Sequence, residues 1–122
     1  MERLVAGDLT IDVEEIESPP RLRLDWHGKS NDRQPRQTLA PFFARILETA
    51  APRRLLVEMR FERLEHFNSS TISSVIDFIH DASAQTVPVV IGYDARITWQ
   101  KIAFEALRVF TRGDGLLELR SS

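Results

Sequence analysis

The chain has 122 residues, of which 43% are hydrophobic and 28% are charged, and this composition is typical of one globular domain. It contains no cysteine, which excludes disulfide bonds, cysteine-ligated metal centres and a thiol nucleophile. Sixteen basic and 18 acidic residues give a formal net charge of −2, which provides no general electrostatic attraction for nucleic acid. We therefore expect a single domain over residues 1–122, with residues 1–7 as a disordered end.

The chain also lacks the sequence signals of a membrane or exported protein. No stretch approaches the roughly 20 apolar residues that a membrane span requires. Charged residues appear too early at the N-terminus for a secretion signal. We therefore expect a cytoplasmic protein that does not enter a membrane.

Two antiparallel strands are expected at the start of the chain. Apolar and polar residues alternate over residues 9–13 and again over residues 21–26, which is the pattern of half-buried strands. The segment Ser18-Pro19-Pro20 separates them, because proline donates no hydrogen bond to a neighbouring strand. A polar loop is expected over residues 27–36.

Three amphipathic helices are expected in the rest of the chain, because apolar residues recur there at helical spacing. We expect Thr38 to cap the first helix and Ala51-Pro52 to end it, and we expect Ser69 or Ser70 to cap the second. The apolar stripes are Leu39, Phe42, Phe43, Ile46 and Leu47 in the first helix, Ile72, Val75, Ile76 and Ile79 in the second, and Trp99, Ile102, Ala103, Ala106, Leu107 and Phe110 in the third.

Apolar runs over residues 55–61 and 87–91 predict strands between these helices, and residues 116–120 predict a last strand. The order β-β-α-β-α-β-α-β predicts an α/β fold with a mixed, mostly parallel sheet joined by right-handed crossovers. The carboxyl ends of parallel strands share one edge, where open α/β sheets usually bind ligands. The loops expected at this edge are residues 27–36, 62–68 and 92–97.

Five hydroxyl side chains stand at the start of the expected second helix, which is more than capping requires. One interpretation is a capped helix whose small residues pack closely on the sheet. The other is a phosphorylation switch, because a phosphate adds roughly −1.5 to −2 charges at the positive end of a helix dipole. Such a charge could repel an acidic partner surface while the domain stays folded. The five residues are Ser69, Ser70, Thr71, Ser73 and Ser74.

Aromatic residues and arginines are expected near the same edge of the sheet. Aromatic residues beside a sheet edge usually cover the core, but Trp, Tyr and Arg also dominate interface hot spots. The second interpretation is therefore a protein-binding patch rimmed by arginines, of which Arg63 or Arg96 could pair with a phosphate on Ser69. The aromatic residues are Trp26, Phe67, Tyr93 and Trp99, and the arginines are Arg33, Arg63 and Arg96.

Enzymatic chemistry has little support in the sequence. His66 could approach Ser69, but no glycine-rich oxyanion elbow or third catalytic residue accompanies them. Glu62, Glu65 and His66 come nearest to a metal-ligand cluster, but they are expected in an irregular loop. We therefore expect no catalytic, metal-binding or cofactor-binding residues, and a small hydrolase or ligand-binding domain is the alternative of another class.

The order of elements and the segment Asn68-Ser69-Ser70-Thr71-Ile72 resemble the STAS domains of bacterial anti-sigma-factor antagonists, which have the SpoIIAA-like fold. In those domains a strand leads into an Asp-Ser-Ser-Gly-Leu type of motif at a helix N-terminus, and a partner kinase phosphorylates its first serine. In this chain Asn68 stands in the place of the Asp, and Thr71 stands in the place of the Gly.

The resemblance is closer to the SiaC-type regulators, a STAS-like family that switches a biofilm-signalling module. Its features are an Asn-Thr-Ser-Ser-Ile segment, a Gly-x-Ser loop and a Tyr-Asp pair that ends an inner strand. The matching stretches are Asn68-Ser69-Ser70-Thr71-Ile72, Gly28-Lys29-Ser30-Asn31 and Tyr93-Asp94, and the resemblance covers roughly residues 8–119.

The SiaC-type resemblance implies a binding protein without catalytic activity, acting in c-di-GMP signalling. The unphosphorylated form would bind and activate a diguanylate cyclase, a Ser/Thr kinase would break that complex, and a phosphatase would restore it. The phosphorylated position carries over to Ser69, and Ser70 and Thr71 are the alternatives. An anti-sigma-factor antagonist of a partner-switching system is the alternative function. The residues expected to bind the partner are Asn68, Arg33, Arg63, Arg96, Tyr93 and Trp99.

Overall fold

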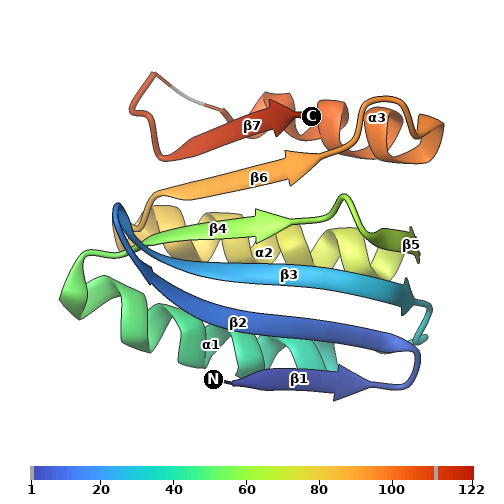
Figure 1. Cartoon of the computed structure of the whole chain (residues 1–122), viewed down its shortest axis with the longest axis horizontal. Helices are drawn as coiled ribbons and strands as arrows, with labels where there is room; N and C mark the ends of the chain where they lie inside the picture. Colours follow the sequence, from blue (N-terminus) through green and yellow to red (C-terminus); the bar gives the residue numbers. More distant parts are fainter. Residues whose placement is uncertain (1, 112) are drawn as a thin grey trace.

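One mixed sheet carries the helices on a single face in the computed structural model, which describes residues 2–111 and 113–122 (Figure 1). Its strands lie in the order β1-β2-β3-β4-β6-β7, and β5 pairs with the end of β3. Strands β1, β2 and β3 are antiparallel neighbours, whereas all the other pairings are parallel. The elements are β1 (Arg3–Ala6), β2 (Leu9–Glu17), β3 (Pro20–Ser30), α1 (Arg36–Arg53), β4 (Leu56–Arg60), β5 (Leu64–Phe67), α2 (Ser69–Ala84), β6 (Val89–Tyr93), α3 (Thr98–Glu105), the short 3-10 helix η1 (Ala106–Phe110) and β7 (Leu117–Ser121). The predicted α/β class with a mostly parallel sheet is confirmed.

The hydrophobic core fills the space between the sheet and the helices. Alternate strand residues point into it, and aromatic rings link the part of it under α1 to the part under α3. The ring of Trp26 lies 6.1 Å from Phe43 of α1 and 4.8 Å from Phe61, measured between centroids. Phe61 in turn lies 4.6 Å from Phe104 of α3. All four side chains are at most 5% exposed, so one continuous core holds α1 and α3 on the same face.

Within the segment over residues 1–7, for which a disordered end is expected, Arg3–Ala6 forms strand β1, and residue 1 lies outside the described residues. Strand β1 pairs antiparallel with β2, and Arg3 opposes Asp12 in that register. The Arg3 guanidinium donates a 2.6 Å hydrogen bond to the Asp12 carboxylate across the pair. Pairing with β2 therefore orders a segment of four residues, which is too short to predict as a strand from its own sequence.

Two segments expected as loops contain strand residues. Strand β3 continues to Ser30, which shortens the expected loop over residues 27–36. Within the expected loop over residues 62–68, Leu64–Phe67 forms β5 and pairs in parallel with the end of β3. This short strand buries Leu64 and Phe67, and it brings the start of α2 close to the end of β3.

The helix boundaries also differ from the sequence expectations. Helix α1 begins directly after Pro35, without a side-chain cap, so Thr38 is its third residue rather than its N-cap. The helix passes Pro52 and ends at Arg53, followed by Arg54 with a left-handed φ of 55°. The third helix changes at Ala106 from an α-helix to η1.

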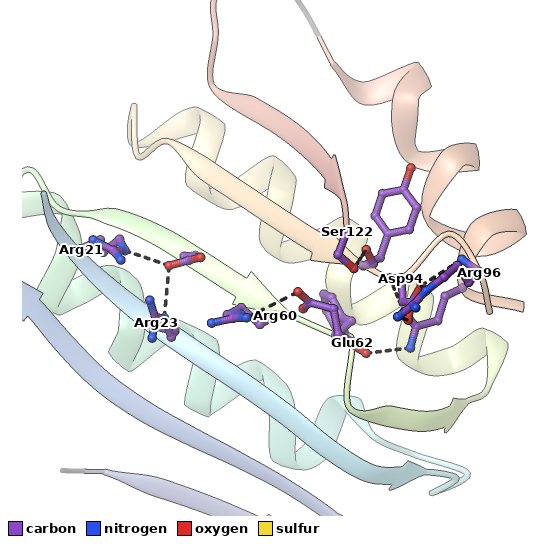
Figure 2. Close-up of polar contacts among 11 residues, drawn as sticks. Arg21, Arg23, Arg60, Glu62, Asp94, Arg96 and Ser122 are labelled. Carbon is purple, nitrogen blue, oxygen red and sulfur yellow. Dashed lines mark hydrogen bonds and ion pairs between the residues drawn. The ribbon is translucent and has the colours of Figure 1, made fainter.

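The face of the sheet opposite the helices carries ion pairs (Figure 2). The Nε atoms of Arg21 and Arg23 lie 2.8 Å and 3.3 Å from the same oxygen of Glu58. Burial raises the pKa of Glu58, but the hydrogen bonds from the two arginines outweigh burial and hold that pKa below its ordinary value. The charged residues on this face are thus largely paired with one another.

Within the described residues, none of the helices combines the length and the apolar character needed to cross a membrane.

Candidate functional site

Asn68 caps α2, so neither serine that follows it performs this role. The Oδ1 atom of Asn68 accepts hydrogen bonds from the Thr71 backbone N–H at 2.9 Å and from the Thr71 hydroxyl at 2.8 Å. Its Nδ2 atom donates to the Asp32 carbonyl at 2.6 Å, which ties the cap to the segment after β3. The expectation that Ser69 or Ser70 caps the helix is wrong, because asparagine is an equally good cap and stands where β5 ends.

Thr71 is a structural residue inside this turn. It is fully buried, and its hydroxyl lies 2.7 Å from the Ser30 hydroxyl, which is also buried. A phosphate cannot reach this oxygen in the folded domain. Thr71 is therefore not supported as an alternative phosphorylation site.

The Gly28-Lys29-Ser30 stretch supports the same turn from β3. Gly28 has a φ of +88°, and a side chain there would collide with the Asp8 carbonyl. That carbonyl accepts a 3.0 Å hydrogen bond from the Lys29 backbone N–H. The glycine thus permits a close approach of two chain segments, and Ser30, two residues on, provides the hydroxyl that meets Thr71.

Ser69 and Ser70 are exposed on the first turn of α2. Ser70 lines an open hollow of about 480 Å³ between α2 and the start of α1, and Arg33 and Arg36 line it as well. Arg36 is paired at 2.6 Å with Asp77 of α2. Ser69 is not among the residues that line this hollow. The two serines thus offer their hydroxyls to different parts of the surface.

For three of the four aromatic residues the core interpretation is confirmed and the binding-patch interpretation is wrong. Trp26 and Tyr93 are completely buried, and Phe67 is 7% exposed. Tyr93 points its hydroxyl to Glu105 at 3.3 Å, so its side chain is not available to a partner. Trp99 is half-buried and packs on Phe67 with a centroid distance of 5.1 Å. The aromatic rings near this edge of the sheet close the core over β5 and α3.

Among the three expected arginines, Arg96 has a partner within the chain (Figure 2). Its Nε and Nη2 atoms each donate a 3.0 Å hydrogen bond to the Asp94 carboxylate. The Arg96 side chain holds the pKa of Asp94 below its ordinary value, and the Arg96 backbone N–H adds to this effect. The Arg96 side chain is nevertheless 85% exposed, and Arg33 and Arg63 are exposed as well.

Gln100 organises the carboxyl edge, and sequence reasoning missed it. Its Nε2 atom donates to the carbonyls of Phe61 at 2.8 Å and Leu64 at 3.0 Å, and its Oε1 atom accepts from the Asp94 N–H at 2.8 Å. One fully buried amide therefore joins the ends of β4 and β6 to the start of β5. The sequence feature that could have indicated this role was a glutamine beside the apolar residues of the third helix.

The geometry offers no support for a Ser–His hydrolase. His66 lies on β5, is exposed, and stands 6.4 Å from the ring of Trp99, measured between centroids. Among the described residues, no hydrogen bond joins His66 to Ser69, and the contact made by Ser69 is through its carbonyl, which accepts from Ser73 at 3.2 Å. Residues 2–111 and 113–122 contain no group of three His, Cys, Asp or Glu side chains placed to hold a metal ion.

Comparison with known proteins adds information about the fold. No protein-family model matches the chain, and no curated protein matches it. Among solved structures, it is similar to an uncharacterized protein of the DUF3478 family from Shewanella loihica PV-4, described as having a SpoIIAA-like fold, with a TM-score of 0.60. The match covers 100% of this chain and 92% of that chain at 13% sequence identity. The chain has a SpoIIAA-like fold. The STAS-like part of the sequence resemblance is thereby confirmed, and at this identity the likeness concerns the fold.

Proposed function

We propose that this protein is a non-enzymatic regulatory domain whose binding to a protein partner is controlled by phosphorylation at the first turn of α2. The observation that supports this function best is that Asn68, and neither of the two serines, caps the helix in that turn. Asn68 satisfies the helix N-terminus, so the exposed hydroxyls of Ser69 and Ser70 are not needed for capping. Modification of either serine would then alter the surface and leave the cap intact.

A phosphate at this place is compatible with the folded helix. Negative charge near a helix N-terminus is favourable by about 0.3–1 kcal/mol, because it interacts with the positive end of the helix dipole. The effect on a partner would be larger, since a neutral hydroxyl becomes a group of roughly −1.5 to −2 charges. The phosphate therefore acts as a local electrostatic switch.

Ser69 is the proposed acceptor, with Ser70 as its alternative. The position directly after the Asn is the one implied by the resemblance to the SiaC-type regulators, and Ser69 is exposed there. The exposed Ser70 lines the same hollow as Arg33 and Arg36. A phosphate on Ser70 could pair with Arg33 within the chain, whereas a phosphate on Ser69 would be directed to a partner.

The proposed partner is a diguanylate cyclase, and a Ser/Thr kinase and a phosphatase set the phosphorylation state. The proposed contact surface surrounds the start of α2 and contains Asn68, the half-buried Trp99 and the exposed arginines Arg33, Arg63 and Arg96. The SpoIIAA-like fold is equally compatible with an anti-sigma-factor antagonist. Identification of the proteins that co-purify with the unphosphorylated chain from its native cells distinguishes these two partners.

Peptide mass spectrometry of the protein purified from its native cells, with phosphatase inhibitors present, tests the acceptor. We expect a phosphate on Ser69. For the binding effect, Ser69→Asp should weaken partner affinity at least about tenfold, while the neutral Ser69→Asn, of the same size as Asp, should bind as the wild type does. Equal weakening by both variants would attribute the effect to size rather than charge and would contradict the switch.

A further inference from the structure

A second apolar stripe runs along α3 and η1. It begins at Trp99, which also packs against the core, and continues on the outer side of these helices. The residues of these helices that face the core are Gln100, Phe104 and Leu107, which are at most 3% exposed. On the other side Ile102 is 68% exposed and Val109 is 80% exposed. The sequence expectation that Ile102 and Ala106 belong to the core stripe is therefore wrong.

This outer stripe consists of Trp99, Ile102, Ala106 and Val109, and it is continuous. Residues separated by three and four positions lie on the same side of a helix, and the spacings here are of that kind. The change to a 3-10 helix keeps the alignment, because residues three apart eclipse one another in that helix. Ala106 is exposed and Trp99 is half-buried, so the stripe is accessible along its length.

Exposed apolar side chains are concentrated on this stripe. In the described part of the chain, the large hydrophobic residues that are mostly exposed are Val5, Ile102 and Val109, and two of these three belong to the stripe. Single exposed apolar residues are ordinary on protein surfaces, whereas a grouped set marks an interaction site. The stripe is therefore a surface that a partner would cover.

Charges along one flank of the stripe alternate in sign. Lys101 and Arg108 are exposed, and the half-buried Glu105 lies between them in the sequence. The Oε2 atom of Glu105 accepts a 3.3 Å hydrogen bond from the Tyr93 hydroxyl, which holds the carboxylate in place. The other oxygen, Oε1, makes no hydrogen bond or ion pair among the described residues.

We propose that α3 packs antiparallel against α3 of a second copy of this chain, about a two-fold axis close to Ile102. With the axis at that point, Ile102 meets its own counterpart, whereas Val109 lies opposite position 95 of the second copy, before α3 begins. Trp99 lies against Ala106 of the second copy, so a large side chain fills the space left by a small one. Lys101 comes beside Glu105 of the second copy, and the symmetry repeats each of these contacts.

The occupant is a second copy because the stripe is complementary to itself. A two-fold axis repeats every contact, so the fit of the large Trp99 against the small Ala106 and the opposite charges of Lys101 and Glu105 each contribute twice. One short pair of helices falls at the lower end of the range of interface areas, which corresponds to a weak and concentration-dependent dimer. The interface leaves Ser69 and Ser70 outside the paired helices, but it covers Trp99, so the dimer and the proposed partner surface overlap at that side chain.

Single-cysteine crosslinking tests this arrangement directly, because the wild-type chain has no cysteine. Ile102→Cys places a thiol next to the axis, and Val5→Cys is a matched control with similar exposure of the native residue, 68% against 63%. Copper–phenanthroline in air oxidises two thiols to one disulfide. We expect Ile102→Cys to form the disulfide-linked dimer at least about tenfold faster than Val5→Cys at equal concentration, because disulfide formation requires Cα atoms within about 7 Å.

Sedimentation velocity provides a second measurement that does not depend on oxidation. The wild-type chain should show a dimer that increases with concentration, and Ile102→Asp should abolish it while Val5→Asp preserves it. Lys101→Glu should also weaken the dimer, since it places a second carboxylate beside Glu105 of the other copy. A wild-type chain that is still monomeric at about 1 mM, or equal crosslinking rates for the two cysteine variants, would overturn the proposal.

Discussion

Two pairs of hydroxyl residues at the same edge of the sheet differ in what they do. Ser30 and Thr71 are buried and lie 2.7 Å apart, measured between hydroxyl oxygens, and Thr71 also donates to Asn68. Ser69 and Ser70 are exposed, and their hydroxyls make no hydrogen bond within the described residues. Asn68 binds the third residue after it, which lies inward, and the two residues between them lie outside.

This contrast separates stability from binding within one helical turn. Changes to Ser30 and Thr71, the inner pair, should lower the free energy of unfolding, since they leave buried polar atoms without partners. Changes to Ser69 and Ser70, the outer pair, should alter the surface that a partner or a kinase contacts. A composition count treats the four hydroxyls alike, whereas burial divides them into two classes.

The largest loss of stability is expected from Gly28→Ala, which disturbs the strand segment that carries Ser30. The new side chain would collide with the Asp8 carbonyl and would have to adopt a φ of +88°. We expect the free energy of unfolding, measured by urea denaturation, to fall by about 3 kcal/mol or more.

Gly7→Ala is the matched control for this experiment. Gly7 also has a positive φ, of +60°, but nothing lies within 4 Å of the position that its Cβ would take. Its loss should therefore be limited to the conformational cost of about 1–2 kcal/mol. Equal losses for the two variants would mean that the close approach of Asp8 contributes nothing.

A smaller loss is expected from Thr71→Val, which keeps the shape of the side chain and removes its hydroxyl. The Ser30 hydroxyl then loses its 2.7 Å partner in a buried place, and Asn68 loses one of its two donors from Thr71. The expected cost is about 1–3 kcal/mol in the free energy of unfolding. The double variant Ser30→Ala/Thr71→Val should cost less than the two single variants together, because it removes both members of the buried pair. Strict additivity would show that the two hydroxyls are not coupled.

The strands and helices that bury many apolar residues were predictable, and the short or polar connections were not. The alternation of apolar and polar residues identified β2 and β3, because every second residue over part of each strand is buried. Strands β1 and β5 were missed, since each has four residues and depends on a neighbouring strand for its order. The true cap of α2 was missed as well, because Asn68 and Ser69 are equivalent caps until the end of β5 is known.

The candidate site was predictable in place but not in detail. The sequence located a cluster of hydroxyls at the start of the second helix, and that is where they lie. Which of them are exposed depends on the rotation of α2 against the sheet, and this rotation is set by the packing of Val75, Phe78 and Ile79. The rotation of α3 is equally a tertiary property, and for this reason Ile102 was assigned to the core.

The smallest effect on stability is expected from the outer pair, in the variants Ser69→Ala and Ser70→Ala. Both residues are exposed and neither caps the helix, so each variant should keep the free energy of unfolding within about 0.5 kcal/mol of the wild-type value. Their effects on modification should differ, because phosphopeptides from native cells should disappear in Ser69→Ala and persist in Ser70→Ala. A loss of more than about 1 kcal/mol for Ser69→Ala would place its hydroxyl among the structural ones. In that case burial would no longer separate the two classes of hydroxyl, and the phosphate would have to disturb the fold in order to act.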